Sequence, residues 1–214
     1  MDTNIGIWER VLEAPTKAYQ ELFEVERDYL VEKISPNSQV LDVGCGEGRN
    51  IKNILAKTKN VFGVDNDQVA VKDAAKNFEN IPTVKVIQAE ASKLPFKNDF
   101  FDAVTFLMIL PNLANEKQSA LAEAVRVLKP NGILILSTFA ETAFNERMKI
   151  YKQIKAPIKK IERTTVIFDN VVSEQFSLDQ LKALADEAGL IITENRKIGE
   201  LAYILTLKKS EHHH

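Results

Sequence analysis

The stretch Val40-Leu41-Asp42-Val43-Gly44-Cys45-Gly46-Glu47-Gly48 decides the fold of this chain. A short apolar run leads into three glycines at alternate positions, and apolar residues at helical spacing follow the last of them. Glycine adopts positive φ angles and lets a ligand approach the backbone closely. The first turn of a following helix offers free N–H groups, which attract anionic groups. A strand, a glycine turn and a helix in this order therefore predict a ligand-binding turn.

Strand and helix patterns alternate downstream of this turn. Short apolar runs predict further strands at 61–64, 84–88, 103–108 and 133–137. A helix at 68–78 follows Asp67, which can cap its N-terminus. Another helix at 115–128 begins with Asn115 and Gln118, which resemble a capping box. Regular alternation of this kind implies right-handed crossovers and a mostly parallel sheet.

The segments outside this alternation predict a cap. Residues 5–34 have the pattern of one or two amphipathic helices, interrupted at Pro15. Residues 142–161 predict one further helix, kinked at Pro157. The next residues predict a hairpin of 164–168 with 171–176 around Asp169-Asn170.

The C-terminal part predicts the last helix and the end of the sheet. Ser177 and Gln180 resemble a second capping box, and Gly189 ends the helix that they begin. Final strands are expected at 191–194 and 203–208. We therefore expect one domain over 1–210, with its core at about 36–138 and 177–208 and its cap segments at about 5–34 and 142–176.

Composition excludes several classes of function. The formal net charge of -2 favours neither nucleic acid nor a membrane as partner, and no apolar run approaches the roughly 20 residues that span a bilayer. The lone cysteine, Cys45, suits a reducing cytoplasm. All three histidines end the chain, and residues 211–214 resemble a tag remnant. Without them the chain has no histidine base, Ser–His triad or His-ligated zinc, and no metal site is expected.

The glycine stretch resembles motif I of the class I S-adenosylmethionine-dependent methyltransferases. The resemblance covers residues 38–137 well and the last strands loosely. It continues in order through Gly63-Val64-Asp65, Ala89 to Phe96, Phe101-Asp102-Ala103-Val104 and Arg126 to Gly132. A nicotinamide dinucleotide site is disfavoured, because G-x-G-x-G replaces its G-x-G-x-x-G spacing. The resemblance implies a doubly wound α/β fold: a seven-stranded, mostly parallel sheet with helices on both faces and an antiparallel last strand.

The resemblance also implies S-adenosylmethionine as cofactor and S-adenosylhomocysteine as product. Asp65 would accept both ribose hydroxyls, with Asn66 beside the adenine edge. Glu90 would accept from the adenine amino group, and the Ala91 N–H would donate to a ring nitrogen. For Asp65 and Glu90, a role as solvated surface acids stays open as the alternative.

Near the methionine end, Asp42 would orient the glycine turn or the methionine amino group, and Leu107 would supply a carbonyl to that group. Cys45 suits a small position in the turn, although a place near a helix N-terminus can lower a thiol pKa. The full set of expected cofactor-binding residues is Asp42, Gly44, Cys45, Gly46, Gly48, Asp65, Asn66, Glu90, Ala91 and Leu107.

Catalytic residues are less defined by the sequence. Methyl transfer from a sulfonium is an in-line displacement, and the protein contributes alignment and electrostatics. A base is needed only for an acceptor that is still protonated, and without histidine it would have to be Asp, Glu, Tyr or Lys. In the expected cap, Tyr19 and Tyr151 are the candidate hydroxyl donors or bases. The Asn-Pro-Pro-Tyr-like and Pro-Cys motifs of two nucleic-acid methyltransferase subclasses are absent, which disfavours those subclasses.

The acceptor is expected to be a small molecule, with other classes left open. Residues 146–163 hold seven basic and two acidic side chains, whereas residues 1–34 hold eight acidic and four basic ones. Two solvated helix faces explain this pattern, and a surface for an RNA, protein or anionic acceptor is the alternative. A non-catalytic cofactor-binding module also stays open, and the oligomeric state is not indicated.

Overall fold

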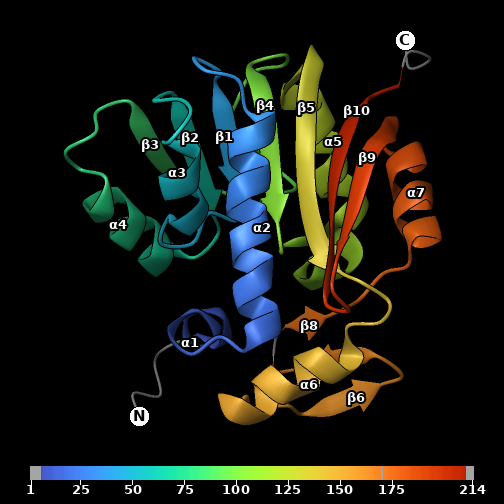
Figure 1. The fold of residues 1–214 in the computed structure, drawn as a ribbon. Helices are drawn as coiled ribbons and strands as arrows, with labels where there is room; N and C mark the ends of the chain where they lie inside the picture. Colours follow the sequence, from blue (N-terminus) through green and yellow to red (C-terminus); the bar gives the residue numbers. More distant parts are fainter. Residues whose placement is uncertain (1–5, 170, 211–214) are drawn as a thin grey trace.

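A seven-stranded sheet forms the centre of the computed structural model, which describes residues 6–169 and 171–210. The strand order is β3-β2-β1-β4-β5-β10-β9 (Figure 1). All pairs from β3 to β5 are parallel, and β10 is antiparallel to both of its neighbours. The predicted doubly wound sheet is therefore confirmed. The strands are β1 (Val40–Val43), β2 (Val61–Asp65), β3 (Val84–Gln88), β4 (Phe101–Leu107), β5 (Leu128–Phe139), β9 (Leu190–Ile198) and β10 (Ala202–Lys209).

Helices cover both faces of the sheet, because strand side chains alternate between two cores. On β5, Ile135 joins the core shared with α2 (Lys17–Lys33) and α3 (Arg49–Ile54), whereas Leu134 and Leu136 join the other core. The second core is closed by α5 (Lys117–Val127) and α7 (Leu178–Glu187). Figure 1 shows α2 running across the front of the sheet and α5 lying behind it. The remaining core helix is α4 (Gln68–Asn77), and two short 3-10 turns, η1 (Leu110–Asn112) and η2 (Ala114–Glu116), follow β4.

Two of the three predicted helix caps are confirmed. The Asp67 carboxylate accepts from the Val69 and Ala70 N–H groups at the start of α4. Ser177 and Gln180 form the reciprocal capping box of α7. The predicted box of Asn115 with Gln118 is wrong.

The failed cap has a local cause. The 3-10 turn η2 runs directly into α5, so Glu116 takes the cap position, and its side chain accepts from the Ser92 hydroxyl instead of from the first N–H groups of α5. Gln118 instead donates from Nε2 to the Glu187 carboxylate on α7, 2.7 Å away. A contact between two helices has replaced the local cap.

The predicted long helix at 142–161 is also wrong. The helix α6 covers Phe144–Gln153 and ends before Lys155, which has a left-handed φ of 50°. Pro157 lies beyond this end, where it disfavours helical backbone at the preceding residue. The chain then forms β6 (Lys160–Glu162), β7 (Thr165–Ile167) and β8 (Val172–Ser173). The predicted hairpin corresponds to the antiparallel β7–β8 pair, with Asn170 of its turn outside the described residues.

Parts of both cap segments lie at the carboxyl edge of the parallel strands, whereas α2 of the N-terminal segment covers a face of the sheet. The N-terminal segment forms α1 (Ile7–Glu13) and α2, separated at Pro15 as predicted; its residue 5 and the presumed tag at 211–214 lie outside the described residues. Figure 1 shows α1, α6, β6 and β8 beyond the end of the sheet toward which β4 and β5 point. Arg10 of α1 donates to the Ile154 carbonyl at the end of α6, 3.1 Å away. Among the helices described, none is long and apolar enough to cross a bilayer.

Candidate functional site

The glycine turn connects the end of β1 to α3. Gly44, Gly46 and Gly48 all have positive φ angles of 72°, 53° and 96°, which explains glycine at each position. A Cβ at Gly44 would lie 2.3 Å from Ile109, and one at Gly48 would lie 2.3 Å from Phe78. A Cβ at Gly46 would meet no atom within 4 Å, so this part of the turn borders open space.

Asp65 holds the turn to the end of β2. Its carboxylate accepts from the Gly46 N–H at 2.8 Å and from the Asp67 N–H at 2.9 Å. Each carboxylate oxygen keeps a further lone pair for a ligand donor. Nearby, Asn66 donates weakly to the exposed Glu90 carboxylate at 3.4 Å, so the predicted ribose and adenine residues lie side by side.

Two adjoining clefts, each about 620 Å³, surround the turn. The Asp65 cleft is lined by residues that include Asp65, Asn66, Glu90, Ala91, Met108 and Glu116. The Trp8 cleft lies on the other side of the turn and is lined by residues that include Leu12, Cys45, Gly48, Arg49, Asn50, Leu55, Phe78 and Ile81. Both clefts share Trp8, Glu9, Gly44, Gly46 and Leu107. Nine of the ten predicted cofactor residues therefore line these two adjoining clefts, to which α1 contributes Trp8 and Glu9.

The tenth residue, Asp42, lies beneath the turn. It is fully buried; Oδ1 accepts from the Thr105 hydroxyl at 2.6 Å, and Oδ2 has no partner among the described residues. Burial raises the pKa of Asp42 to about 7, against the opposing effects of the Thr105 hydrogen bond and the Arg49 charge. The buried Asn50 Oδ1 also has no partner in the described part of the chain. Buried acceptors without donors fit a ligand that brings an ammonium group.

Sequence reasoning missed a buried polar network beside the turn. Glu26 of α2 is fully buried, and its carboxylate accepts from Arg49 at 2.7 Å and from the Ser137 hydroxyl at 2.5 Å. One signal was present in the sequence, because Glu26 stands four residues from both Leu22 and Leu30 on the apolar stripe of its helix.

The two catalytic candidates do not border the clefts. Tyr19 is fully buried, its hydroxyl has no partner among the described residues, and burial raises its pKa well above the usual value. Tyr151 is also buried, and its hydroxyl pairs with that of Ser173 at 3.0 Å. The catalytic role of these tyrosines stays a prediction.

Cys45 occupies the small buried position expected for it in the turn. Burial, reinforced by the charges of Asp42 and Asp65, raises the pKa of its thiol, so the lowering that a helix N-terminus can cause does not occur here. Cys45 therefore serves as a small buried residue packed beneath the turn, close to Gly63.

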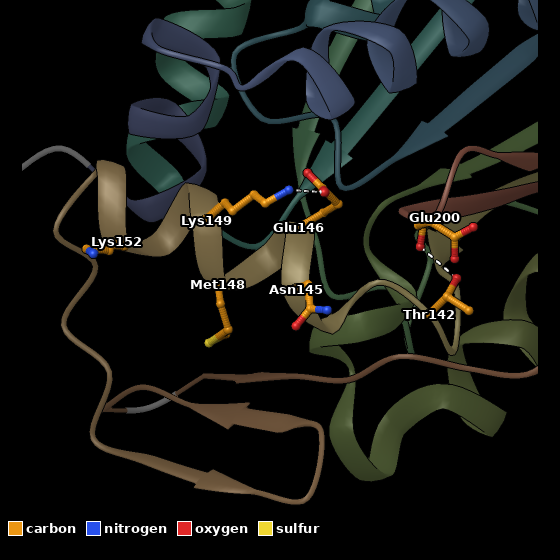
Figure 2. Close-up of a pocket in the computed structure, with 7 residues that line it drawn as sticks. All are labelled: Thr142, Asn145, Glu146, Met148, Lys149, Lys152 and Glu200. Carbon is orange, nitrogen blue, oxygen red and sulfur yellow. Dashed lines mark hydrogen bonds and ion pairs between the residues drawn. The ribbon is translucent and has the colours of Figure 1, made fainter.

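Four of the seven basic side chains of segment 146–163 are buried or paired with acidic side chains. Arg147 is fully buried and donates to the Thr164 carbonyl, to Ser173 and to Gln175. Figure 2 shows Lys149 directed toward Glu146 in a groove of about 540 Å³ on α6, and the two side chains form an ion pair. Two further lysines are paired: Lys159 with Asp169 and Lys160 with Glu162.

Comparisons with known proteins agree with this geometry. A family described as a methyltransferase domain matches residues 41–136. The ubiquinone/menaquinone biosynthesis C-methyltransferase of Vibrio vulnificus is 32% identical over 126 residues, which are 54% of this chain and 46% of that protein. The chain spans about half the length of the curated relatives it matches.

Solved structures share the fold over most of the chain. A protein of Pyrococcus horikoshii superimposes with a TM-score of 0.73 at 23% identity, covering 92% of this chain and 93% of that one. The 1,6-didemethyltoxoflavin-N1-methyltransferase of Burkholderia thailandensis, solved with 1,6-didemethyltoxoflavin and S-adenosylhomocysteine, has a TM-score of 0.70 at 17% identity, covering 94% and 82%. The methyltransferase-domain match over residues 41–136, the sheet order and the glycine turn together support a class I S-adenosylmethionine-dependent methyltransferase domain.

Proposed function

We propose that this chain transfers a methyl group from S-adenosylmethionine to a small-molecule acceptor. One observation carries the proposal: nine of the residues expected to bind the cofactor line two adjoining clefts, and beneath them Asp42 has a carboxylate oxygen without a partner among the described residues. These residues lie at the ends of β1, β2 and β4 and directly after β3. Doubly wound sheets bind their ligands at this edge, outside the carboxyl ends of the strands.

The chain's own residues divide the work of holding the cofactor. Asp65 would accept the ribose hydroxyls, while Glu90 and the Ala91 N–H would bind the adenine edge. The Leu107 carbonyl and the free oxygen of Asp42 would receive the methionine ammonium group. Bound S-adenosylmethionine supplies an electrophilic methyl group, and the protein aligns the acceptor in line with it and excludes water.

The cleft lining favours a small apolar or aromatic acceptor. The Trp8 cleft presents Trp8, Leu12, Leu55, Phe78 and Ile81, and its volume lies in the range of about 300–1,000 Å³ that small-ligand sites occupy. The names of two relatives point the same way, since one acts in quinone biosynthesis and the other was solved with 1,6-didemethyltoxoflavin. An RNA acceptor is disfavoured, because four of the seven basic side chains at 146–163 are buried or ion-paired inside the cap.

The cap segments would control entry of the acceptor. We propose that α1 and α2, together with the segment 142–176, form a lid at the carboxyl edge, within one methyltransferase domain of cytoplasmic location. Tyr19 and Tyr151 stay the candidate polar groups of this lid. Because burial raises the pKa of Tyr19, we expect its hydroxyl to act as a hydrogen-bond donor rather than as a base.

Calorimetric titration with S-adenosylmethionine, S-adenosylhomocysteine and NAD tests the cofactor. We expect micromolar-scale binding of the first two and much weaker binding of NAD. Tight NAD binding without any response to S-adenosylmethionine would contradict the proposal.

An acceptor screen, guided by mass spectrometry of co-purified small molecules, tests the substrate class. Methylation of a small aromatic or quinone-like compound is the expected result. Binding of RNA that weakens steeply with salt would point to a nucleic-acid acceptor instead. Cofactor binding without turnover on any acceptor would favour a cofactor-binding module.

A further inference from the structure

The buried Glu26 carboxylate on α2 is not among the residues expected to bind the cofactor or to act in catalysis. Glu26 has no exposed surface and lines neither cleft. A buried carboxylate is costly unless it is paired and hydrogen-bonded, and Glu26 meets both conditions through Arg49 and Ser137. Arg49 directly follows the glycine turn, and Ser137 of β5 contacts the bend after β4, so each partner adjoins a segment that lines both clefts.

The first partner ties α2 to the glycine turn. Arg49 is the first residue of α3, directly after Gly48. Its guanidinium forms the ion pair with Glu26 and also lies 4.5 Å from the ring centroid of Phe23, one helical turn earlier on α2. The position of α2 therefore restrains the end of the glycine turn through two contacts.

The second partner ties α2 to the bend after β4. The Ser137 carbonyl and hydroxyl both accept from the Met108 N–H, at 3.0 and 3.1 Å. Met108 has a left-handed φ of 59°, a conformation that a non-glycine residue keeps only where its surroundings enforce it. The Leu107 carbonyl, which is expected to accept from the methionine ammonium group, shares a peptide bond with the Met108 N–H. The contact between Met108 and Ser137 therefore also fixes the orientation of this carbonyl.

We propose that Glu26 is a positioning residue for the cofactor. By binding Arg49 and Ser137 at once, it holds the glycine turn and the Leu107–Met108 bend at the separation that the methionine half of the cofactor requires. The inference rests on the proposed function. If Glu26 has this role, the packing of α2 against the sheet contributes to cofactor binding. The helix α2 lies outside residues 41–136, which the family match covers.

The charges around this network support the assignment. Arg49 is the cation that both Glu26 and Asp42 face, and Asp65 adds a further negative charge nearby. This arrangement leaves an excess of negative charge beside the turn. A ligand end that carries a sulfonium and an ammonium group would compensate it.

The test compares Glu26→Gln with Glu24→Gln, a matched change at an exposed position of the same helix. Titration with S-adenosylhomocysteine should show affinity about 10-fold or more weaker for Glu26→Gln and unchanged for Glu24→Gln, since a charge-assisted hydrogen-bond pair is lost only in the first. Circular dichroism at the assay temperature establishes that each variant is folded. A purely structural role would lower the melting temperature yet leave the affinity of the folded protein unchanged.

Ser137→Ala provides a second variant, which keeps the Glu26–Arg49 ion pair and the carbonyl contact to Met108 but removes the hydroxyl that joins Glu26 to this bend. Ser137 lines neither cleft, so a weaker affinity cannot come from a lost direct contact. We expect a smaller but measurable loss, of about 3-fold or more. Affinities equal to wild type in both folded variants would overturn the role of Glu26. Absence of S-adenosylhomocysteine binding by the wild type would overturn the proposed function itself.

Discussion

The cofactor side and the cap side of the site each bury one charged side chain. The two buried charges differ in the kind of hydrogen-bond partner that they have. On the cofactor side, the buried Glu26 carboxylate has an ionic partner, Arg49, and lies near other acids. On the cap side, the buried Arg147 guanidinium donates to two carbonyls, a hydroxyl and an amide oxygen, all neutral. The cofactor side is therefore electrostatically suited to a cationic ligand, whereas the cap keeps a buried positive charge that orders its own backbone.

The largest expected effect concerns the cap. Arg147→Ala should lower the free energy of unfolding by about 3 kcal/mol or more, because it leaves several buried acceptors without donors. Urea denaturation measures the loss, and Lys149→Ala on the exposed face of α6 should change stability by less than about 0.5 kcal/mol. If the two sides are independent, folded Arg147→Ala keeps its affinity for S-adenosylhomocysteine. A parallel loss of affinity would show that the cap and the cofactor side act as one unit.

The second prediction concerns the cofactor side. Asp65→Ala should weaken S-adenosylhomocysteine binding more than Glu90→Ala does, because Asp65 would accept two ribose hydroxyls and also holds the Gly46 N–H. Charge-assisted hydrogen bonds contribute roughly 1.5–3 kcal/mol each, so the expected loss for Asp65→Ala is at least about 10-fold. Calorimetry measures both variants. Equal affinities of wild type and Asp65→Ala would place the ribose elsewhere.

The third prediction uses the titration of Asp42. Its pKa is raised to about 7 in the folded protein, so the stability linked to this group is present below its unfolded pKa and is lost as the pH rises through about 7. A cationic ligand favours the ionised form, and affinity for S-adenosylmethionine should therefore rise from pH 6 to pH 8, by at most about 10-fold per unit. Asp42→Asn should flatten this profile. A pH-independent affinity in the wild type would show that Asp42 does not meet the ligand's charge.

The smallest effect is expected at the cap tyrosines. Tyr151→Phe removes a hydroxyl that pairs with Ser173 and lines neither cleft, and Tyr19→Phe removes one without a described partner. Each variant should reduce turnover several-fold while leaving cofactor affinity nearly unchanged. This is the pattern expected for the loss of a group that acts on the acceptor and not on the cofactor. Steady-state kinetics with the identified acceptor, beside calorimetry, separates the two quantities. Unchanged turnover in both variants would leave the tyrosines as packing residues.

Local signals were predicted well where nothing distant competed with them. Asp67 caps α4 and Ser177 caps α7 because each bond closes within three residues. Asn115 failed because a 3-10 turn occupies its place and Gln118 contacts a distant helix. The helix expected at 142–161 ended early, because Lys155 turns left-handed and the following residues pair as a sheet.

The alternating fold, the glycine turn and the family resemblance follow from the amino-acid sequence, because φ preferences, strand and helix periods and short motifs are encoded in neighbouring residues. Which charges are buried, and what they contact, depends on how the elements pack in three dimensions. Glu26 meets Ser137 across 111 positions, and Arg10 reaches Ile154 across 144. The raised pKa of Asp42 likewise comes from burial beneath a turn and from charges on other elements. Such effects depend on distances in space, which no local pattern specifies.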